Sequence, residues 1–180
     1  GMTGGAIPVQ GGVVLVTSRM NQILEIDEEN FIARVEPGVV VAKIHQAVEA
    51  RGLFYPPDPA SSSVCTIGGN IGECAGGPRA VKYGVTRDYV LGLTAVMPSG
   101  DIIKTGVATA KGVAGYDLTR LIVGSEGTLA VVTQIILKLL PKPRAVKTLA
   151  VFYDSMDKAA KAVSSVMKQA IIPRCVEYLD

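Results

Sequence analysis

The chain has 180 residues, of which 48% are hydrophobic and 19% charged, and its 18 basic and 16 acidic residues leave a net charge of +2. This balance is typical of a globular protein, and the lack of a basic cluster argues against nucleic-acid binding. The longest apolar stretches fall well short of the ~20 residues of a membrane span, so no transmembrane segment is expected. The start of the chain also lacks the basic and apolar regions of a signal peptide.

The cysteines and the single histidine limit the chemistry further. Cys65, Cys74 and Cys175 are odd in number and form no CxxC pair, which disfavours a disulfide framework and favours a reducing, cytoplasmic setting. A zinc site needs more soft ligands than the chain offers, so no metal site is expected. His45 falls in a helical apolar pattern and is expected on a helix surface or half-buried.

The first half of the chain predicts one helix and several strands. Apolar residues 13–16 predict a buried strand, and alternation at 22–26 and 31–36, around a turn at 27–30, predicts a hairpin. Helical spacing at 40–51, followed by Gly52, predicts a helix that ends there. Residues 56–77 read as a loop with one turn of helix from near Thr66.

The second half predicts strands at 89–97, 102–105 and 129–140, with Asp117 capping a short helix over 118–123. The Pro-Lys-Pro at 141–143 is the clearest boundary in the chain. After it, the pattern predicts a strand at 146–153, a helix at 154–169 and a strand at 175–179. A strand–helix–strand of this size cannot close a core of its own.

Two glycine-rich runs, at 56–77 and 124–133, are the most informative part of the sequence. Small residues let the backbone approach a polyanionic ligand and offer it N–H groups. Neither run fits the common phosphate loops, because GxGxxG is absent and no Gly-Lys-Ser/Thr triplet follows a glycine run. Gly124–Gly127 is also a GxxG, which opens a KH-like RNA-clamping alternative, but Glu126 would repel phosphate and the loop holds no Lys or Arg.

Seven short runs occur in the order found in one family of flavoproteins. The chain resembles the FAD-linked oxidase family, with its vanillyl-alcohol-oxidase or PCMH-type FAD-binding domain, most closely the branch of the glycolate oxidase flavin subunit and D-lactate dehydrogenase. The runs that carry the resemblance are TGGAIP at 3–8, PPDP at 56–59, CTIGGN at 65–70, AGGP at 75–78, KYGVTRD at 82–88, VAGYDL at 113–118 and GSEGTL at 124–129.

The resemblance implies an α+β fold with a mixed β-sheet and flanking helices. Residues 2–143 would form part of the FAD-binding domain, with the tail of a first subdomain at 2–20 and a second subdomain at 21–143. Residues 144–180 would begin a ferredoxin-like cap. We therefore expect a fragment that starts inside the pyrophosphate loop and ends within the cap, and that is colourless and inactive when purified. The apolar faces left uncovered predict a homo-oligomer.

The resemblance also implies the residues that bind FAD. Each lies on one of the matching runs or within three residues of one, and they are Thr3, Gly4, Gly5, Pro56, Asp58, Pro59, Ser61, Ser62, Thr66, Gly68, Gly69, Asn70, Gly72, Ala75, Gly76, Gly77, Tyr83, Gly84, Gly124, Ser125, Glu126, Gly127, Val131 and Val132. Tyr89 and Tyr116 are expected to be structural. The Arg87–Asp88 and Asp117–Arg120 pairs are expected to be ion pairs or caps.

The implied activity is that of a FAD-dependent dehydrogenase or oxidase of 2-hydroxy acids, in which a hydride passes from substrate to FAD and a separate acceptor removes the electrons. In the family, the carboxylate-binding residues and the catalytic histidine come from the cap and beyond, so no catalytic residue is assigned here. Two alternatives stay open: a truncated, non-catalytic flavin- or nucleotide-binding fragment, and another reaction of the family, such as ether-lipid synthesis or sugar-lactone oxidation.

Overall fold

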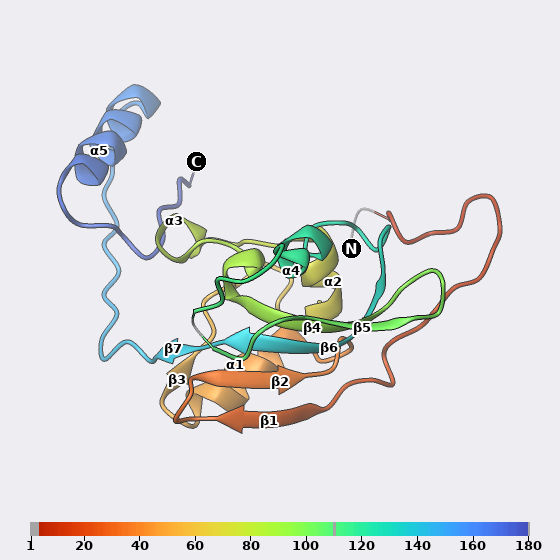
Figure 1. The fold of residues 1–180 in the computed structure, drawn as a ribbon. Coiled ribbons are helices and arrows are strands. Elements are labelled where there is room, and N and C mark those ends of the chain that lie inside the picture. The colour runs from red at the N-terminus through yellow and green to blue at the C-terminus, as the bar shows by residue number, and fades with distance from the viewer. Residues whose placement is uncertain (1–3, 110, 180) are drawn as a thin grey trace.

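A five-stranded antiparallel sheet forms the centre of the protein in a computed structural model, which describes residues 4–109 and 111–179. The strands follow the order β1 (Ile23–Asp27), β2 (Ile32–Val35), β6 (Val131–Lys138), β4 (Val90–Val96), β5 (Ile102–Gly106) (Figure 1). The predicted α+β class is confirmed. The sheet is antiparallel rather than mixed, because β1–β2 and β4–β5 are hairpins and β6 enters between them antiparallel to both neighbours.

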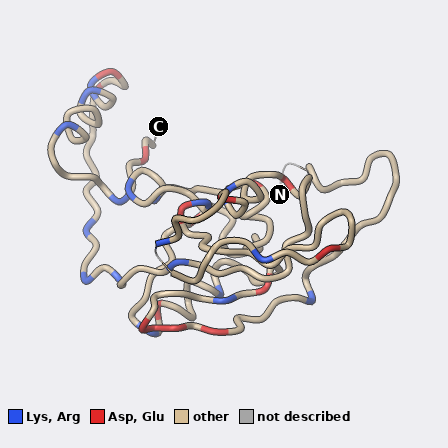
Figure 2. The backbone as a smooth tube through the Cα atoms, in the orientation of Figure 1, with Lys and Arg blue, Asp and Glu red and all other residues tan. Residues whose placement is uncertain are grey.

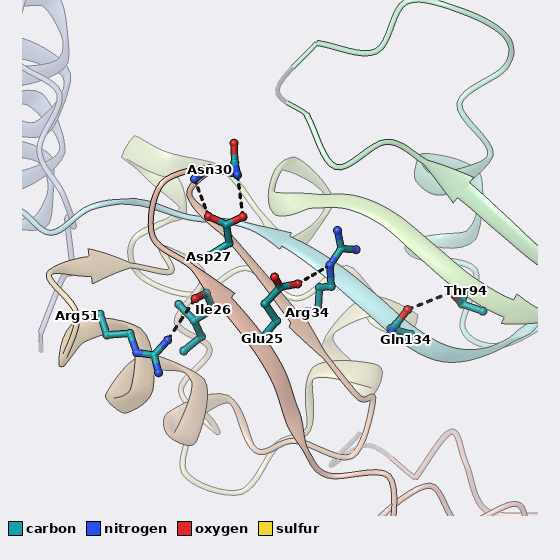
Figure 3. A network of polar contacts seen from close by, with 8 residues as sticks. All are labelled: Glu25, Ile26, Asp27, Asn30, Arg34, Arg51, Thr94 and Gln134. Carbon is teal, nitrogen blue, oxygen red and sulfur yellow. Dashed lines mark hydrogen bonds and ion pairs between the residues drawn. The ribbon is translucent and has the colours of Figure 1, made fainter.

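The predicted hairpin at the start of the sheet is confirmed, and polar side chains hold it (Figure 3). Asp27 accepts hydrogen bonds from the backbone N–H and the side-chain amide of Asn30, at 2.9 and 2.7 Å. These bonds lower the pKa of Asp27. Across the two strands, Arg34 pairs with Glu25 at 2.8 Å. The turn therefore follows from local side-chain chemistry that the sequence contains.

Most of the helices are short. They are α1 (Val41–Glu49), α2 (Ile67–Glu73), α3 (Ala80–Tyr83), the 3₁₀ turn η1 (Thr86–Tyr89) and α4 (Leu118–Ile122), with α5 (Met156–Lys168) standing apart from the sheet (Figure 1). A two-stranded ribbon pairs β3 (Leu53–Phe54) with β7 (Leu140–Pro141). Helices α1, α2, α4 and α5 and strands β1, β2, β4, β5 and β6 lie where the sequence predicts them. The sequence patterns do not predict β3, β7, α3 and η1, which are all four residues or fewer.

The core lies between α1, α2 and the sheet. Val41, Ile44 and Val48 recur on one face of α1 and are fully buried. The sheet and α2 contribute the other members of this cluster, among them Ala33, Val35, Ile67, Ile71, Leu93, Ile135 and Leu137. Burying one large aliphatic side chain stabilises the fold by about 1.5–3 kcal/mol, so this cluster fixes the position of α2 and of the loops at both its ends.

Three predicted strands are absent from the described residues. Residues 13–16, 146–153 and 175–179 have no strand assignment, and most of their side chains are exposed, with Val13 at 96% and Phe152 at 95%. Their apolar sequences suit a strand, but a strand forms only where a neighbour accepts its hydrogen bonds. None of the helices in the described part of the chain has the length and apolar character needed to cross a bilayer.

Candidate functional site

The two glycine-rich runs meet at the C-terminal end of α2. Gly124 donates its backbone N–H to the carbonyl of Ile71 at 2.8 Å, and Glu126 donates to the carbonyl of Gly72 at 2.9 Å. These bonds satisfy carbonyls that the end of a helix leaves without partners. They also occupy two N–H groups of the GxxG loop that an RNA-clamping role would need, which counts against the KH-like alternative.

The second contact joins the proline-rich stretch to the glycines after α2. The N–H of Asp58 donates to the carbonyl of Gly76 at 3.2 Å. Gly77 has a φ of +112°, and a Cβ there would collide with the backbone carbonyl of Asp58. Only glycine permits this approach without strain, so Gly77 is required by the packing of one loop on the other.

Helix α1 holds the loop that contains the predicted serines. Ala42 donates its N–H to the carbonyl of Ser62 at 2.9 Å, and the His45 Nε2 lies 2.9 Å from the carbonyl of Pro57. Burial lowers the pKa of His45, so its ring is neutral and Nε2 donates the hydrogen bond. Ser61 accepts from the N–H groups of Val64 and Cys65 through its carbonyl, which bends the loop back toward α2.

Asp58 is paired inside the protein. Its Oδ2 lies 2.8 Å from the Arg79 Nη2, and its Oδ1 lies 3.9 Å from the His45 Nδ1. Arg79 is the partner of Asp58, because the neutral His45 ring carries its proton on Nε2 and its Nδ1 has none to donate. Arg79 lies far from Asp58 in the sequence, and no role was predicted for it. The separation of Asp58 and Arg79 in the sequence does not predict that they form an ion pair. The structure therefore gives this candidate cofactor residue a structural contact of its own.

Helix α2 carries the centre of the second run. Thr66 is its N-cap, and the Thr66 hydroxyl accepts from the N–H of Gly69 at 3.4 Å. Asn70 is buried, and its side-chain Nδ2 has no hydrogen-bond partner among the residues that the structure describes. A buried amide without a partner costs about 1–3 kcal/mol, so this group marks a place where a ligand acceptor fits.

The remaining glycines of the two runs divide into two kinds. A Cβ at Gly68 would lie 2.7 Å from the Pro37 Cβ, so Gly68 serves packing, whereas Gly124 has a φ of +89°, a conformation that favours glycine. Gly69 and Gly127 are open: a Cβ at Gly69 meets only the Thr66 hydroxyl at 3.6 Å, and one at Gly127 meets nothing within 4 Å. The space over Gly69 and Gly127 is therefore free of protein atoms.

Two neighbouring polar side chains, Thr86 and Arg87, support the loops. No role was predicted for Thr86. Arg87 was expected to pair with Asp88, but in the described part of the chain Asp88 pairs with Arg120 instead, at 3.3 Å. Thr86 is fully buried and donates its hydroxyl to the carbonyl of Ala75 at 2.6 Å. Arg87 donates from Nη2 to the carbonyl of Val123 at 2.7 Å. Thr86 thus fixes the first loop, and Arg87 fixes the residue just before Gly124. The expectation that Asp117 caps α4 is confirmed, since its Oδ1 accepts from the N–H of Arg120 at 2.9 Å.

The other predicted FAD-binding residues lie at α3, in β6 and in the N-terminal segment. Tyr83 packs its ring edge-on against Phe54, with centroids 5.5 Å apart, and Gly84 leaves room for the Asp88 carboxylate. Val131 and Val132 pair with β4 on one side, whereas β2 pairs only with residues 135–138 of β6. The opposite edge at Val131 and Val132 thus has no strand beside it in the described chain. Gly4 and Gly5 lie in a turn of the exposed N-terminal segment, and Thr3 lies outside the described residues.

Two hollows lie elsewhere on the molecule. One of about 300 Å³ is lined by residues of the β1–β2 turn and the end of β6, and one of about 440 Å³ lies beside α4 and the loop before it. None of the predicted FAD-binding residues lines either hollow. In the part of the chain that the structure describes, no group of three or more His, Cys, Asp or Glu side chains could hold a metal ion.

Comparison with known proteins defines the class to which this fold and site belong. The family described as FAD binding domain matches residues 1–106, which is more than half of the chain. The chain therefore belongs to the FAD-binding domain family. The predicted cofactor, FAD, is confirmed at the level of the family, and an open glycine-rich surface beside an unpartnered buried amide is compatible with it.

Individual relatives agree with this assignment. The chain is 58% identical over 179 residues to the glycolate oxidase subunit GlcD of Bacillus subtilis (strain 168), covering 99% of this chain and 38% of that protein. It is 41% identical over 180 residues to a D-lactate dehydrogenase of Anaerostipes hadrus, covering all of this chain and 38% of that protein. A solved structure of alkyldihydroxyacetonephosphate synthase has a TM-score of 0.83 at 26% identity, covering 97% of this chain and 34% of that one. The chain thus spans about 38% of the length of these two curated relatives.

Proposed function

We propose that this chain is the FAD-binding part of a flavin-dependent dehydrogenase or oxidase of 2-hydroxy acids of the glycolate or D-lactate type. The single observation that carries the proposal is the meeting of the two glycine-rich runs at the end of α2, where Gly124 and Glu126 bond to Ile71 and Gly72. The names of the two sequence relatives support the substrate class.

The residues of this chain bind and orient the cofactor in this proposal. Open backbone at Gly69 and Gly127 admits the close approach of a polyanion, and the Asn70 amide donates to a cofactor acceptor. The other predicted residues of the two runs, where they do not serve packing, would complete this surface. FAD held by these residues would supply the chemistry of hydride transfer from the carbon that bears the substrate hydroxyl, with a separate acceptor to remove the electrons.

The proposal extends to the organisation of the protein. Residues 2–143 form the FAD-binding portion, with a subdomain boundary near residue 20, and residues 144–180 begin the cap. Support for the boundary at 143 comes from α5, which stands away from the sheet beyond the Pro-Lys-Pro (Figure 1).

We also place the protein in the cytoplasm, because its three cysteines are free, and assign it a homo-oligomeric state.

A titration with FAD tests the binding step. In the apoprotein that carries this chain we expect saturable quenching of flavin fluorescence, and an Asn70→Ala variant should bind FAD about tenfold more weakly, because ~1.4 kcal/mol of hydrogen bonding is lost. Asn21→Ala, at an exposed position outside the site, is the matched control. Equal affinities of all three proteins for FAD would show that Asn70 does not contribute to binding. The absence of any saturable FAD binding would refute the cofactor role of the chain.

The substrate class has its own test in the protein that carries this chain. Anaerobic addition of D-lactate or glycolate should bleach the visible flavin absorbance, whereas lactamide, which lacks the carboxylate, should not. A protein that binds FAD but is reduced by neither acid would contradict the activity and leave cofactor binding intact.

A further inference from the structure

An ion pair joins two of the loops on which FAD-binding residues are predicted. Asp58 lies in the proline-rich stretch 56–59, and Arg79 directly precedes α3, two residues after Gly77. The Arg79 Nη2 lies 2.8 Å from the Asp58 Oδ2, and the two side chains are only 18% and 24% exposed. The backbone makes the same connection, because the Asp58 N–H donates to the carbonyl of Gly76. The pair therefore fastens one predicted cofactor loop to the other.

The charge of Asp58 is balanced by Arg79 alone. Among the basic side chains that the structure describes, only those of Arg79 and His45 come within ion-pair distance of the Asp58 carboxylate. His45 is neutral and donates its ring proton to the carbonyl of Pro57. Without Arg79, a half-buried carboxylate would stand unpaired on a loop that is proposed to meet a polyanion, and it would repel that ligand.

Arg79 is held in place from a second direction. Its guanidinium carbon lies 5.2 Å from the centre of the buried Phe54 ring, and that of Arg174 lies 5.1 Å from the same centre. Burial lowers the pKa of Arg79, Asp58 raises it, and the charge of Arg174 lowers it again. Arg79 stays charged, because an arginine loses its proton only far above neutral pH. One planar group thus pairs with Asp58 and contacts Phe54, a combination for which a lysine is poorly suited.

We propose that Arg79 is a positioning residue for FAD. It neutralises Asp58 and holds the loop of that residue against the Gly76–Gly77 turn before the cofactor binds. The predicted FAD-binding residues of both loops are then already in place, which lowers the ordering cost of binding. Arg79 acts through Asp58 and is not assigned a contact with the cofactor. The inference rests on the proposed function, since it adds a residue to the same FAD-binding surface.

A double-mutant cycle on FAD affinity tests the proposal in the apoprotein that carries this chain. Arg79→Gln should weaken FAD binding at least about tenfold, because it leaves the Asp58 carboxylate unpaired. The same change in an Asp58→Asn background should weaken binding by less than about threefold, since no charge then needs a partner. Arg144→Gln, at an exposed arginine outside the two loops, is the matched control and should bind FAD as the parent does.

Two results of the cycle would overturn the proposal. A loss of equal size in both backgrounds would show that Arg79 acts independently of Asp58, and an Arg79→Gln protein with the affinity of the parent would show that it does not act at all. Should Arg79→Gln not fold, Arg79→Lys takes its place. Lysine keeps the charge but not the planar fork, so we expect a loss of about threefold that the Asp58→Asn background removes. An unchanged FAD affinity of Arg79→Lys would then refute the role of Arg79.

Hydrogen exchange of the same apoproteins reports on the loop without the cofactor. Asp58 carries the only backbone N–H in residues 56–59, because the other three residues are prolines. Its amide should exchange at least about tenfold faster in Arg79→Gln than in the parent, and at the parent's rate in Arg144→Gln. An unchanged exchange rate in Arg79→Gln would show that Arg79 does not hold the loop.

The parent protein separates this inference from the proposed function. If the parent does not bind FAD, the proposed function is refuted. If the parent binds FAD and Arg79→Gln binds it equally well, only the role of Arg79 is refuted.

Discussion

At the scale of single residues, the glycines of the two glycine-rich runs have different structural roles. Gly77 and Gly68 are needed because neighbouring backbone or proline atoms occupy the place of a Cβ. Gly69 has no such neighbour and adopts an ordinary helical conformation within α2. Glycine in a helix costs about 0.5–1 kcal/mol relative to alanine, so its presence at an open position favours a ligand as the reason.

Substitution of these two glycines should separate folding from binding. Gly77→Ala should lower the free energy of unfolding by at least about 1–3 kcal/mol, because φ is positive and the new Cβ collides with Asp58. Gly69→Ala should raise it by about 0.5–1 kcal/mol and still weaken FAD binding. Urea unfolding and FAD titration of both variants measure this. A Gly69→Ala protein with unchanged FAD affinity would show that the cofactor does not approach there.

His45 makes stability depend on pH. Burial holds its pKa in the folded state below the ordinary value of 6.5, despite the attraction of Asp58 and Glu49, while Arg79 lowers it further. As the pH falls below about 6.5, the unfolded chain takes up this proton first, so the free energy of unfolding decreases until the folded-state pKa is reached. In His45→Gln, which keeps a donor for Pro57, urea unfolding between about pH 8 and 5 should show a shallower decline. An unchanged decline would assign the effect to other groups.

Short helices position the site at the scale of elements. Helix α2 has seven residues and α4 has five, too few for stability in isolation, so caps and packing hold them. Thr66 caps α2 before the first open glycine, and Asp117 caps α4 before the Gly124–Gly127 loop. Thr66 thus fixes the helix that carries Gly69, and Asp117 fixes the helix that leads into the second run.

Loss of the α4 cap should loosen the second run. Asp117→Ala should lower the free energy of unfolding by about 0.5–2 kcal/mol, whereas Asp117→Asn, which can still accept from the Arg120 N–H, should lower it by less. The ion pair of Asp117 with Arg120 at 3.6 Å is exposed and contributes little. Thermal unfolding compares the variants, and equal losses for alanine and asparagine would show that the charge matters more than the cap.

Charge and apolar surface are unevenly spread at the scale of the whole molecule. Acidic residues gather along β1 and its turn, at Glu25, Asp27, Glu28 and Glu29 (Figure 2). Exposed apolar side chains gather instead in the N-terminal segment and in the region of α5, including Val13, Leu149, Phe152 and Leu179. Apolar patches beyond a few hundred Å² are unusual on a monomer and are typical of interfaces.

The isolated chain should therefore associate with itself. Light scattering at micromolar concentration should give a mass above that of a monomer, rising with concentration. Val163→Lys, on the apolar face of α5, should weaken association, and Ser165→Lys, at an exposed position off that face, should not. A monomer mass at all concentrations would refute this prediction.

Local patterns in the sequence determined the hairpin, α1, the Asp117 cap and the glycine-rich runs, because each depends on neighbours within a few residues. Only the tertiary structure decided that Asp58 pairs with Arg79, that Gly68 packs on Pro37 and that Arg174 shares a ring with Arg79. It also left residues 13–16 and 146–153 without strand structure, although their composition suits strands. The physical reason is the same in each case: an ion pair, a close contact or a strand needs a partner, and the fold alone brings distant partners together.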